Sequence, residues 1–177
     1  IAHAGYILMG AVVMTSQGIQ AVLVYLIIYL FMNLGAFLIV IEIHNRTGSF
    51  ELGSYRGFFR RSPFLSIAMS IFLLSLMGIP PLAGFFGKLY VFAAAVDRGL
   101  AWFAVIGAIN SVIAVYYYAR VMKTMVIDTS EETAPVRASW GNTLLVWVML
   151  IPTVGLALFW DAVQKLTVAS GRLFLGH

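Results

Sequence analysis

The sequence predicts an all-α protein, a polytopic transmembrane helix bundle, and three observations lead to this prediction. Of its 177 residues, 62% are hydrophobic and only 10% are charged, whereas soluble domains are roughly 45–50% apolar and about 25% charged. The mean hydropathy is +0.96. The apolar residues gather in uncharged runs near the roughly 20 residues that a helix needs to cross a bilayer. This composition excludes an ordinary soluble domain and intrinsic disorder, and the lack of cysteine excludes a disulfide scaffold.

The charged residues indicate no nucleic-acid partner. Eleven Lys and Arg stand against seven Asp and Glu, which gives a net charge of +4. They cluster in short segments instead of forming one basic face, so nucleic-acid binding gains no support. The chain opens Ile1-Ala2-His3, without an initiator methionine or the basic start of a signal peptide. We therefore expect the C-terminal part of a longer chain that begins inside a helix.

Uncharged runs bounded by charges or turn residues predict the membrane segments. These are 1–14 as a partial span, 19–43, 64–96 as a broken span, 100–127 and 142–160, all within a single transmembrane domain, 1–177. The loop 44–63 carries four arginines, and an acidic hydrophilic loop precedes the last span.

Four helix-breaking residues interrupt the segment 64–96 in its middle: Gly78, Pro80, Pro81 and Gly84. The segment is either one discontinuous helix or two short helices. The positive-inside rule distinguishes the two, because it places the arginine-rich loop in the cytoplasm. If segment 64–96 crosses the membrane once, Arg120 and Lys123 at the end of segment 100–127 lie in the cytoplasm. If it crosses twice, they lie outside. The rule therefore favours one broken helix, with the C-terminus on the outer side.

Lys88 is the one charged side chain that lies far from any span end. An ammonium at mid-membrane costs roughly 2.5–3.5 kcal/mol on insertion scales, so it needs a compensating role. Free backbone at a helix break inside a membrane must be buried by protein or reached by water. A lysine beside such a break is suited to exchange a proton with a water chain or a partner carboxylate. The alternatives are a lysine that snorkels to the interface and one held in a static ion pair.

Other polar side chains inside the spans have less specific interpretations. His3 could relay protons, because histidine titrates near neutrality, or could donate one structural hydrogen bond. Asn33, Asn110 and Ser111 are suited to bond across closely packed helices. Glu42 stands near a span end and is interpreted as a boundary charge.

Three consecutive tyrosines, which include Tyr116 and Tyr117, precede Arg120 and Lys123. Aromatic residues next to snorkelling bases are typical of the belt at a membrane interface. The alternative is that tyrosines of this run line a hydrated path together with Asn110.

No metal or nucleotide site is predicted. The chain has no cysteine and only three scattered histidines, so an iron–sulfur, zinc or haem site has no candidate ligand set. It also lacks the glycine-rich loops that hold nucleotide phosphates.

Several motifs support a family resemblance. Residues 75–90, Ser-Leu-Met-Gly-Ile-Pro-Pro-Leu-Ala-Gly-Phe-Phe-Gly-Lys-Leu-Tyr, resemble the signature of the antiporter-like membrane subunits of respiratory complex I. The Gly-Phe-Phe-Gly-Lys-Leu-Tyr ending, the Asn-Ser pair at 110–111 and the Tyr-Tyr-Tyr-x-Arg run at 116–120 are most similar to the subunit N family of bacterial NADH:quinone oxidoreductase. The segments 1–6 and 34–37 fit the same family. The resemblance spans nearly all of this chain but only the C-terminal part of a family member.

The resemblance implies an antiporter-like inverted-repeat fold, of which this chain forms the second half only. By this resemblance, Lys88 is the lysine on the broken helix of the second repeat, and His3 is the histidine near a hydrated polar axis that carries protons. The resemblance further implies that NADH-to-quinone electron transfer elsewhere in the complex drives the movement of these protons. The resemblance implies no cofactor on this chain, with NADH, FMN, iron–sulfur clusters and quinone in partner subunits.

The same resemblance implies a place in the cell and a set of partners. The partners are neighbouring antiporter-like subunits, small membrane subunits and the lipid bilayer. The membrane is the inner membrane of a bacterium, and the C-terminus is periplasmic. Two other functions stay open: a subunit of a multisubunit sodium/proton antiporter, which shares the broken helix and buried lysine, and a structural scaffold for neighbouring subunits.

Overall fold

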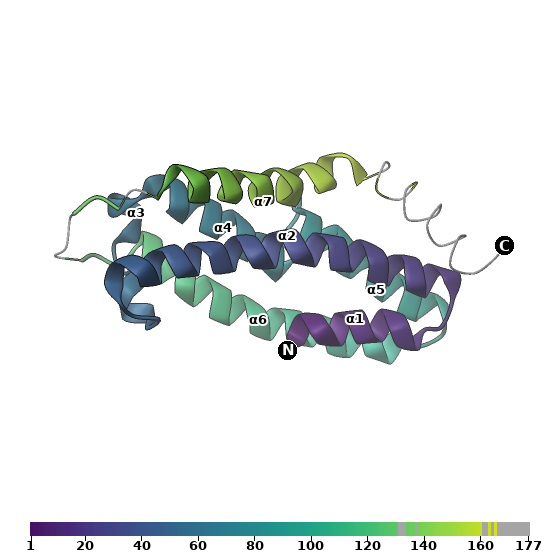
Figure 1. The fold of residues 1–177 in the computed structure, drawn as a ribbon. Helices are drawn as coiled ribbons and strands as arrows, with labels where there is room; N and C mark the ends of the chain where they lie inside the picture. Colours follow the sequence, from purple (N-terminus) through teal and green to yellow (C-terminus); the bar gives the residue numbers. More distant parts are fainter. Residues whose placement is uncertain (131–133, 137, 161–162, 164, 166–177) are drawn as a thin grey trace.

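The computed structural model describes residues 1–130, 134–136, 138–160, 163 and 165. Its helices are α1 (Ala2–Val12), α2 (Ser16–Thr47), η1 (Leu52–Tyr55), α3 (Phe58–Arg61), α4 (Pro63–Met77), α5 (Ala83–Asp97), α6 (Ala101–Val126) and α7 (Trp140–Leu158). The longer helices lie side by side in an elongated bundle (Figure 1). The all-α prediction is confirmed, since the described part of the chain holds helices and no strand.

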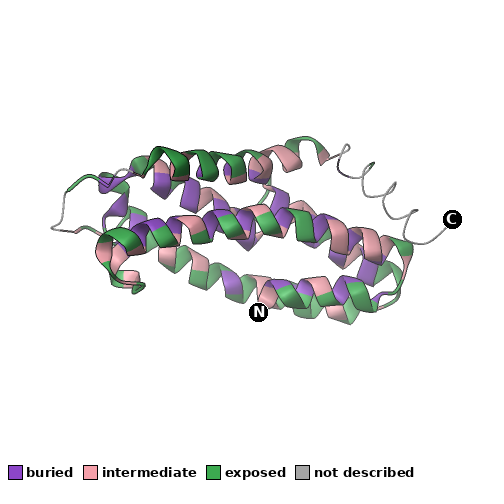
Figure 2. Cartoon of the chain, in the orientation of Figure 1, coloured by how far each residue is buried: buried purple, intermediate pink, exposed green. Residues whose placement is uncertain are grey.

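Three of these helices, α2, α6 and α7, are long and apolar enough to cross a membrane. The helices α1 and α4 are apolar but shorter. Side chains that face the interior of the bundle are buried, while the outer faces of α6 and α7 expose many apolar side chains (Figure 2). An apolar exterior of this kind is expected of a chain surrounded by lipid or other membrane helices.

The helix α2 is the axis of the bundle and contacts α1, α4, α5 and α7. It begins after Thr15, whose hydroxyl accepts a hydrogen bond from the Gly18 backbone N–H at 3.1 Å. The polar stretch at 15–18 thus caps α2 as well as ending the first helix. At the other end α2 continues beyond the expected limit of 43 to Thr47, where Gly48, with φ 69°, terminates it. Glycine adopts this left-handed conformation without steric cost, so the helix stops there.

The helices α4 and α5 follow one another along α2, separated by residues 78–82 (Figure 1). Gly78 ends α4 in the left-handed region with φ 83°, and Pro80 and Pro81 lie in the connection, where neither can donate a backbone hydrogen bond. Gly84 differs from the expectation, because it lies inside the first turn of α5. Its backbone N–H donates to the Ser75 hydroxyl at 3.1 Å, which joins the two half-helices directly.

The loops at the arginine-rich end of the bundle contact each other. The Val136 backbone N–H donates to the Arg61 carbonyl at 2.9 Å, and Arg61 Nε donates to the Ala134 carbonyl at 3.1 Å. The segment between α6 and α7 is thereby held against α3. The tail 161–177 lies outside the described residues except for Val163 and Lys165.

Candidate functional site around Lys88

Lys88 lies in the second turn of α5 and is only 5% exposed. Its Nζ donates to the carbonyl of Leu76 at 3.0 Å, to the carbonyl of Met77 at 2.8 Å and to the hydroxyl of Ser111 at 3.3 Å. The two carbonyls belong to the last turn of α4, where helix geometry leaves carbonyls without an intrahelical partner. They also form the negative end of the α4 dipole. An ammonium has three donors, and the break in the helix supplies two of the three acceptors.

Gly78 makes this arrangement possible in two ways. Its positive φ ends α4, so that the carbonyls point to Lys88. A Cβ at this position would also lie 2.9 Å from Lys88 Cδ and 3.2 Å from Nζ. The glycine at the break therefore leaves room for the lysine as well as turning the chain.

In the described part of the chain no carboxylate contacts Lys88. Its three hydrogen bonds go to carbonyl and hydroxyl oxygens, whereas Lys123 forms an ion pair with Asp128 at 3.6 Å. Of the arrangements that the sequence left open, a static ion pair with a residue of this region is thus not observed. Backbone dipoles stabilise the buried charge here.

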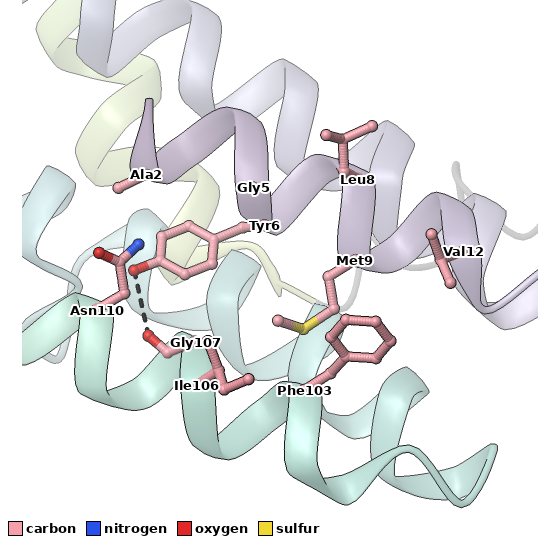
Figure 3. Close-up of a pocket in the computed structure, with 10 residues that line it drawn as sticks. All are labelled: Ala2, Gly5, Tyr6, Leu8, Met9, Val12, Phe103, Ile106, Gly107 and Asn110. Atoms are coloured by element: carbon pink, nitrogen blue, oxygen red, sulfur yellow. Dashed lines mark hydrogen bonds between the residues drawn. The ribbon is translucent and has the colours of Figure 1, made fainter.

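The Ser111 hydroxyl links Lys88 to Tyr6. The hydroxyls of Tyr6 and Ser111 lie 2.7 Å apart, and the Tyr6 hydroxyl also donates to the carbonyl of Gly107 at 3.3 Å. Tyr6 and Asn110 line a cavity of about 280 Å³ between α1 and α6, in which the Tyr6 hydroxyl points toward the Asn110 amide (Figure 3). Two hydroxyls, those of Ser111 and Tyr6, therefore lead from the buried ammonium to the edge of a mostly apolar cavity, where Tyr6 and Asn110 are the polar side chains.

His3 lies in a second polar group, formed with tyrosines of α2 and α6. It is 6% exposed. Its Nδ1 lies 2.7 Å from the Tyr25 hydroxyl, and its Nε2 lies 3.2 Å from the Tyr118 hydroxyl. A neutral imidazole donates from one ring nitrogen and accepts at the other, so the two tyrosines engage both nitrogens.

The ring of Tyr6 lies between the two groups. The Lys88 Nζ is 5.1 Å from the centre of this ring, and the His3 ring packs edge-on against it with centroids 5.8 Å apart. No hydrogen bond joins His3 directly to the Lys88 group in the described residues. The structure thus places both sequence-predicted site residues around one aromatic ring.

Two of the candidate path residues lie elsewhere. Tyr116 and Tyr117 are 66% and 60% exposed, on the outer face of α6, so they do not line the buried polar groups in this chain. Successive helical residues are about 100° apart, and it is Tyr118 that turns inward to His3. The lining of a hydrated path by Tyr116 and Tyr117 stays a prediction, while Asn110 does line the cavity beside Tyr6.

Sequence reasoning missed Tyr25 and did not single out Tyr118 within its run of three tyrosines. A usable signal was present on α2, where Tyr25, Tyr29 and Asn33 recur at intervals of four residues on one helix face.

The sequence indicated that Glu42 is a boundary charge near a span end. In the structure Glu42 is only 3% exposed and accepts a hydrogen bond from the Asn142 side-chain amide of α7. Among the described residues no group of three His, Asp or Glu side chains is arranged to hold a metal ion.

Residues 1–114 match the model of a family described as NADH:quinone oxidoreductase/Mrp antiporter, TM. The chain belongs to this family. Within it, the proteins named NADH-quinone oxidoreductase subunit N are close relatives. One from Anaeromyxobacter sp. is 42% identical over 185 residues, which cover 99% of this chain and 36% of the relative. Another from Rhodospirillum rubrum is 42% identical, with 97% of this chain and 37% of the relative covered.

Solved structures show the same membrane fold of the NADH:quinone oxidoreductase/Mrp antiporter family. A chain of respiratory complex I from Thermus thermophilus with bound aureothin is 29% identical, with a TM-score of 0.78 over 92% of this chain and 37% of that chain. A chain of the Mrp complex from Dietzia sp. is 20% identical, with a TM-score of 0.84 over 96% of this chain and 40% of that chain, and it supports the fold alone. The chain spans little more than a third of the length of the curated relatives described above.

Proposed function

We propose that this chain is part of a proton-translocating membrane subunit of NADH:quinone oxidoreductase. The observation that carries the proposal is the buried Lys88 ammonium, held by the freed carbonyls of Leu76 and Met77 and linked through Ser111 to Tyr6. A buried lysine changes its protonation readily. In the proposed mechanism, electron transfer elsewhere in the complex drives proton movement through this lysine and the polar groups around it.

The hydrogen bonds define what each group does with the proton. The Ser111 hydroxyl accepts from Lys88 and can donate to the Tyr6 hydroxyl, because a hydroxyl is both donor and acceptor. A proton that leaves Lys88 along this chain reaches the Tyr6 hydroxyl, which lies beside Asn110 at the edge of the cavity. His3, held between Tyr25 and Tyr118, is the second proton-exchanging group.

The proposal extends to the cofactors, partners and location. This chain carries no cofactor of its own, and NADH, FMN, iron–sulfur clusters and quinone act in partner subunits. The partners are other membrane subunits of complex I. The helices α4 and α5 together cross the inner membrane of a bacterium once, and the C-terminus lies on the periplasmic side. The charge of the loop 44–63 and the succession of α4 and α5 along α2 support this topology.

The test uses the intact membrane complex that contains the full-length protein, reconstituted in sealed vesicles. We expect addition of NADH and a quinone to acidify the vesicle interior, and an uncoupler to abolish the change. Flavin and iron–sulfur subunits should co-purify with the chain. Purification without such partners would contradict the proposal.

A second candidate function is exchange of sodium for protons in a multisubunit antiporter. The family model that matches residues 1–114 favours it, because its description names the Mrp antiporter beside NADH:quinone oxidoreductase. In that case an imposed sodium gradient would change the internal pH of the vesicles without NADH. The same vesicles therefore distinguish the two functions.

Replacing Ser111 by alanine should reduce proton translocation. The change removes the third acceptor of Lys88 and the link to Tyr6. Hydrogen bonds to charged groups contribute about 1.5–3 kcal/mol, so we expect roughly a tenfold lower rate of uncoupler-sensitive acidification. Ser70→Ala is the control, because the Ser70 hydroxyl bonds only within α4. Equal rates for the two variants would remove Ser111 from the path.

Replacing Tyr118 by phenylalanine should slow translocation several-fold, whereas Tyr117→Phe should have no effect. The first change removes the hydrogen bond to His3 Nε2, while Tyr117 is 60% exposed on the outer face. A neutral hydrogen bond contributes about 0.5–1.5 kcal/mol. The measurement is the ratio of protons moved to NADH oxidised. An effect of Tyr117→Phe that matched or exceeded that of Tyr118→Phe would show that the outer face matters instead.

A further inference from the structure

The position of the half-helix α5 relative to α4 decides whether Lys88 reaches its acceptors. The ammonium belongs to α5, and it lies 3.0 Å and 2.8 Å from the carbonyl oxygens of Leu76 and Met77 on α4. Residues 78–82 separate the two helices, so no continuous helix fixes this distance. A displacement of α5 by about 1 Å away from α4 would take both contacts beyond hydrogen-bond distance. The side-chain packing of α5 must therefore hold it in place.

The face of α5 opposite Lys88 carries two aromatic side chains, Phe86 and Tyr90. They lie two residues before and two residues after Lys88, and a helix turns by about 200° over two residues. Because they are four residues apart, they share one face. The ring of Trp160 stacks on Phe86 with centroids 5.1 Å apart and meets Tyr90 edge-on with centroids 6.0 Å apart. Trp160 therefore packs against α5 from the side opposite Lys88.

Trp160 follows α7, and the packing of that helix fixes where its ring lies. The helix runs along α2 from the end of the bundle that carries α3, and it contacts α2, α4 and α5 (Figure 1). Val146 and Leu150 on its inner face are buried. Near its start, the Asn142 side-chain amide donates to the buried carboxylate of Glu42 on α2. This segment is thus attached to α2 at one end and contacts α5 through Trp160 at the other.

We propose that Trp160 is a positioning residue for Lys88. In this arrangement α7 and Trp160 together form a brace, which holds α5 at the distance from α4 at which the ammonium meets the free carbonyls. Aromatic rings suit this role because they bury a large area and pack in specific geometries. Trp160 acts on proton movement only through Lys88, so its effect on translocation rests on the proposed function, whereas its effect on the position of α5 does not.

Trp160→Ala tests the brace in the intact complex that contains the full-length protein, reconstituted in sealed vesicles. We expect this variant to assemble and to oxidise NADH but to move about threefold fewer protons per NADH, because the aromatic contacts behind Lys88 are lost. Trp160→Phe should restore most of the ratio, since a phenyl ring can still stack on Phe86. Trp147→Ala is the matched control and should keep the normal ratio. It removes the same side chain from α7, but that ring packs on Phe64 at the start of α4, with centroids 5.2 Å apart.

A double-mutant cycle shows whether Trp160 acts through α5. Phe86→Leu removes the ring on which Trp160 stacks and leaves Lys88 in place, so it should lower the ratio of protons to NADH by a similar factor. The double variant should have little more effect than either single variant, because substitutions at the two sides of one contact are not additive. If the two effects multiplied instead, Trp160 and Phe86 would act independently, and the proposal would be overturned.

Hydrogen–deuterium exchange of the intact complex, read by mass spectrometry, tests the brace without measuring proton transport. The amides of residues 83–97 should exchange faster in Trp160→Ala than in Trp147→Ala, because a half-helix that has lost its support opens more often. Equal exchange in the two variants would overturn the proposal, and so would an equal ratio of protons to NADH.

Two further outcomes separate the roles of Trp160. If Trp160→Ala lowered assembly, NADH oxidation and proton movement in proportion, Trp160 would have a structural role only, and the proposal would be overturned. If the unaltered complex moved no protons with NADH, the proposed function would fail. Faster exchange of residues 83–97 in Trp160→Ala would then still support the brace.

Discussion

Lys88→Ala in the full-length protein should leave the complex assembled but lower uncoupler-sensitive proton movement per NADH oxidised by at least about tenfold. The variant removes the group that exchanges the proton, while the freed carbonyls of Leu76 and Met77 and the Ser111 hydroxyl remain. Water can replace the ammonium there, because the site is polar and the side chain leaves space. The variant should therefore keep its fold but lose the coupling of NADH oxidation to proton movement.

The variant Lys88→Arg keeps the positive charge at this position but removes the capacity to exchange a proton. A guanidinium keeps its proton under all working conditions, so this variant should assemble normally and translocate only partially. Lys123→Ala is the control, since the Lys123 side chain is 66% exposed and pairs with Asp128 at the surface. Normal pumping per electron in both Lys88 variants would exclude Lys88 from the path. Loss of the assembled complex in both would instead assign it a scaffold role.

Gly84→Ala should destabilise the joint between the two half-helices. A Cβ at this position would collide with the backbone carbonyl oxygen of Ser75, and backbone atoms cannot turn away as a side chain can. The helices α4 and α5 must then separate, which weakens the bond from the Gly84 N–H to the Ser75 hydroxyl. Overpacking of this kind costs about 1–3 kcal/mol. The measurement is the thermal stability of the assembled complex and its amount in the membrane.

Gly155→Ala is a matched control for this prediction. Gly155 also lies in a membrane helix, α7, and a Cβ there would meet no atom within 4 Å. The same substitution should therefore leave stability unchanged or raise it slightly, since alanine favours helix more than glycine does. Equal stability of the two variants would show that the joint tolerates a wider separation than the structure has.

Several features of the site could be predicted from the sequence because they depend on local chemistry. A lysine far from any span end is visible as the one charge inside a long apolar run. The glycine and the two consecutive prolines ahead of it strongly disfavour a continuous helix, because glycine readily adopts positive φ and each proline lacks a backbone N–H donor. Their proximity in the sequence indicated that Lys88 and the break act together. What the lysine bonds to was open, and the expected alternatives of water or a carboxylate did not include the α4 carbonyls.

The orientation of individual side chains could not be predicted in the same way. The tyrosines 116–118 have nearly identical surroundings in the sequence, yet Tyr118 contacts His3 while its two neighbours face outward. In an apolar span every face is hydrophobic, so periodicity gives the angle between residues without the rotation of the helix. Glu42 shows the same limit: it stands near a helix end, but α7 covers it and Asn142 bonds to it.

The sequence by itself determined the membrane location, the all-α fold, the break before Lys88 and the family, because these depend on composition, on local backbone chemistry and on a contiguous motif. Tertiary structure decided that α4 presents its free carbonyls to Lys88, that Ser111 and Tyr6 continue the chain of hydrogen bonds, and that Tyr25 and Tyr118 hold His3. These contacts join residues from five helices. Only packing fixes how such helices are rotated and displaced against one another.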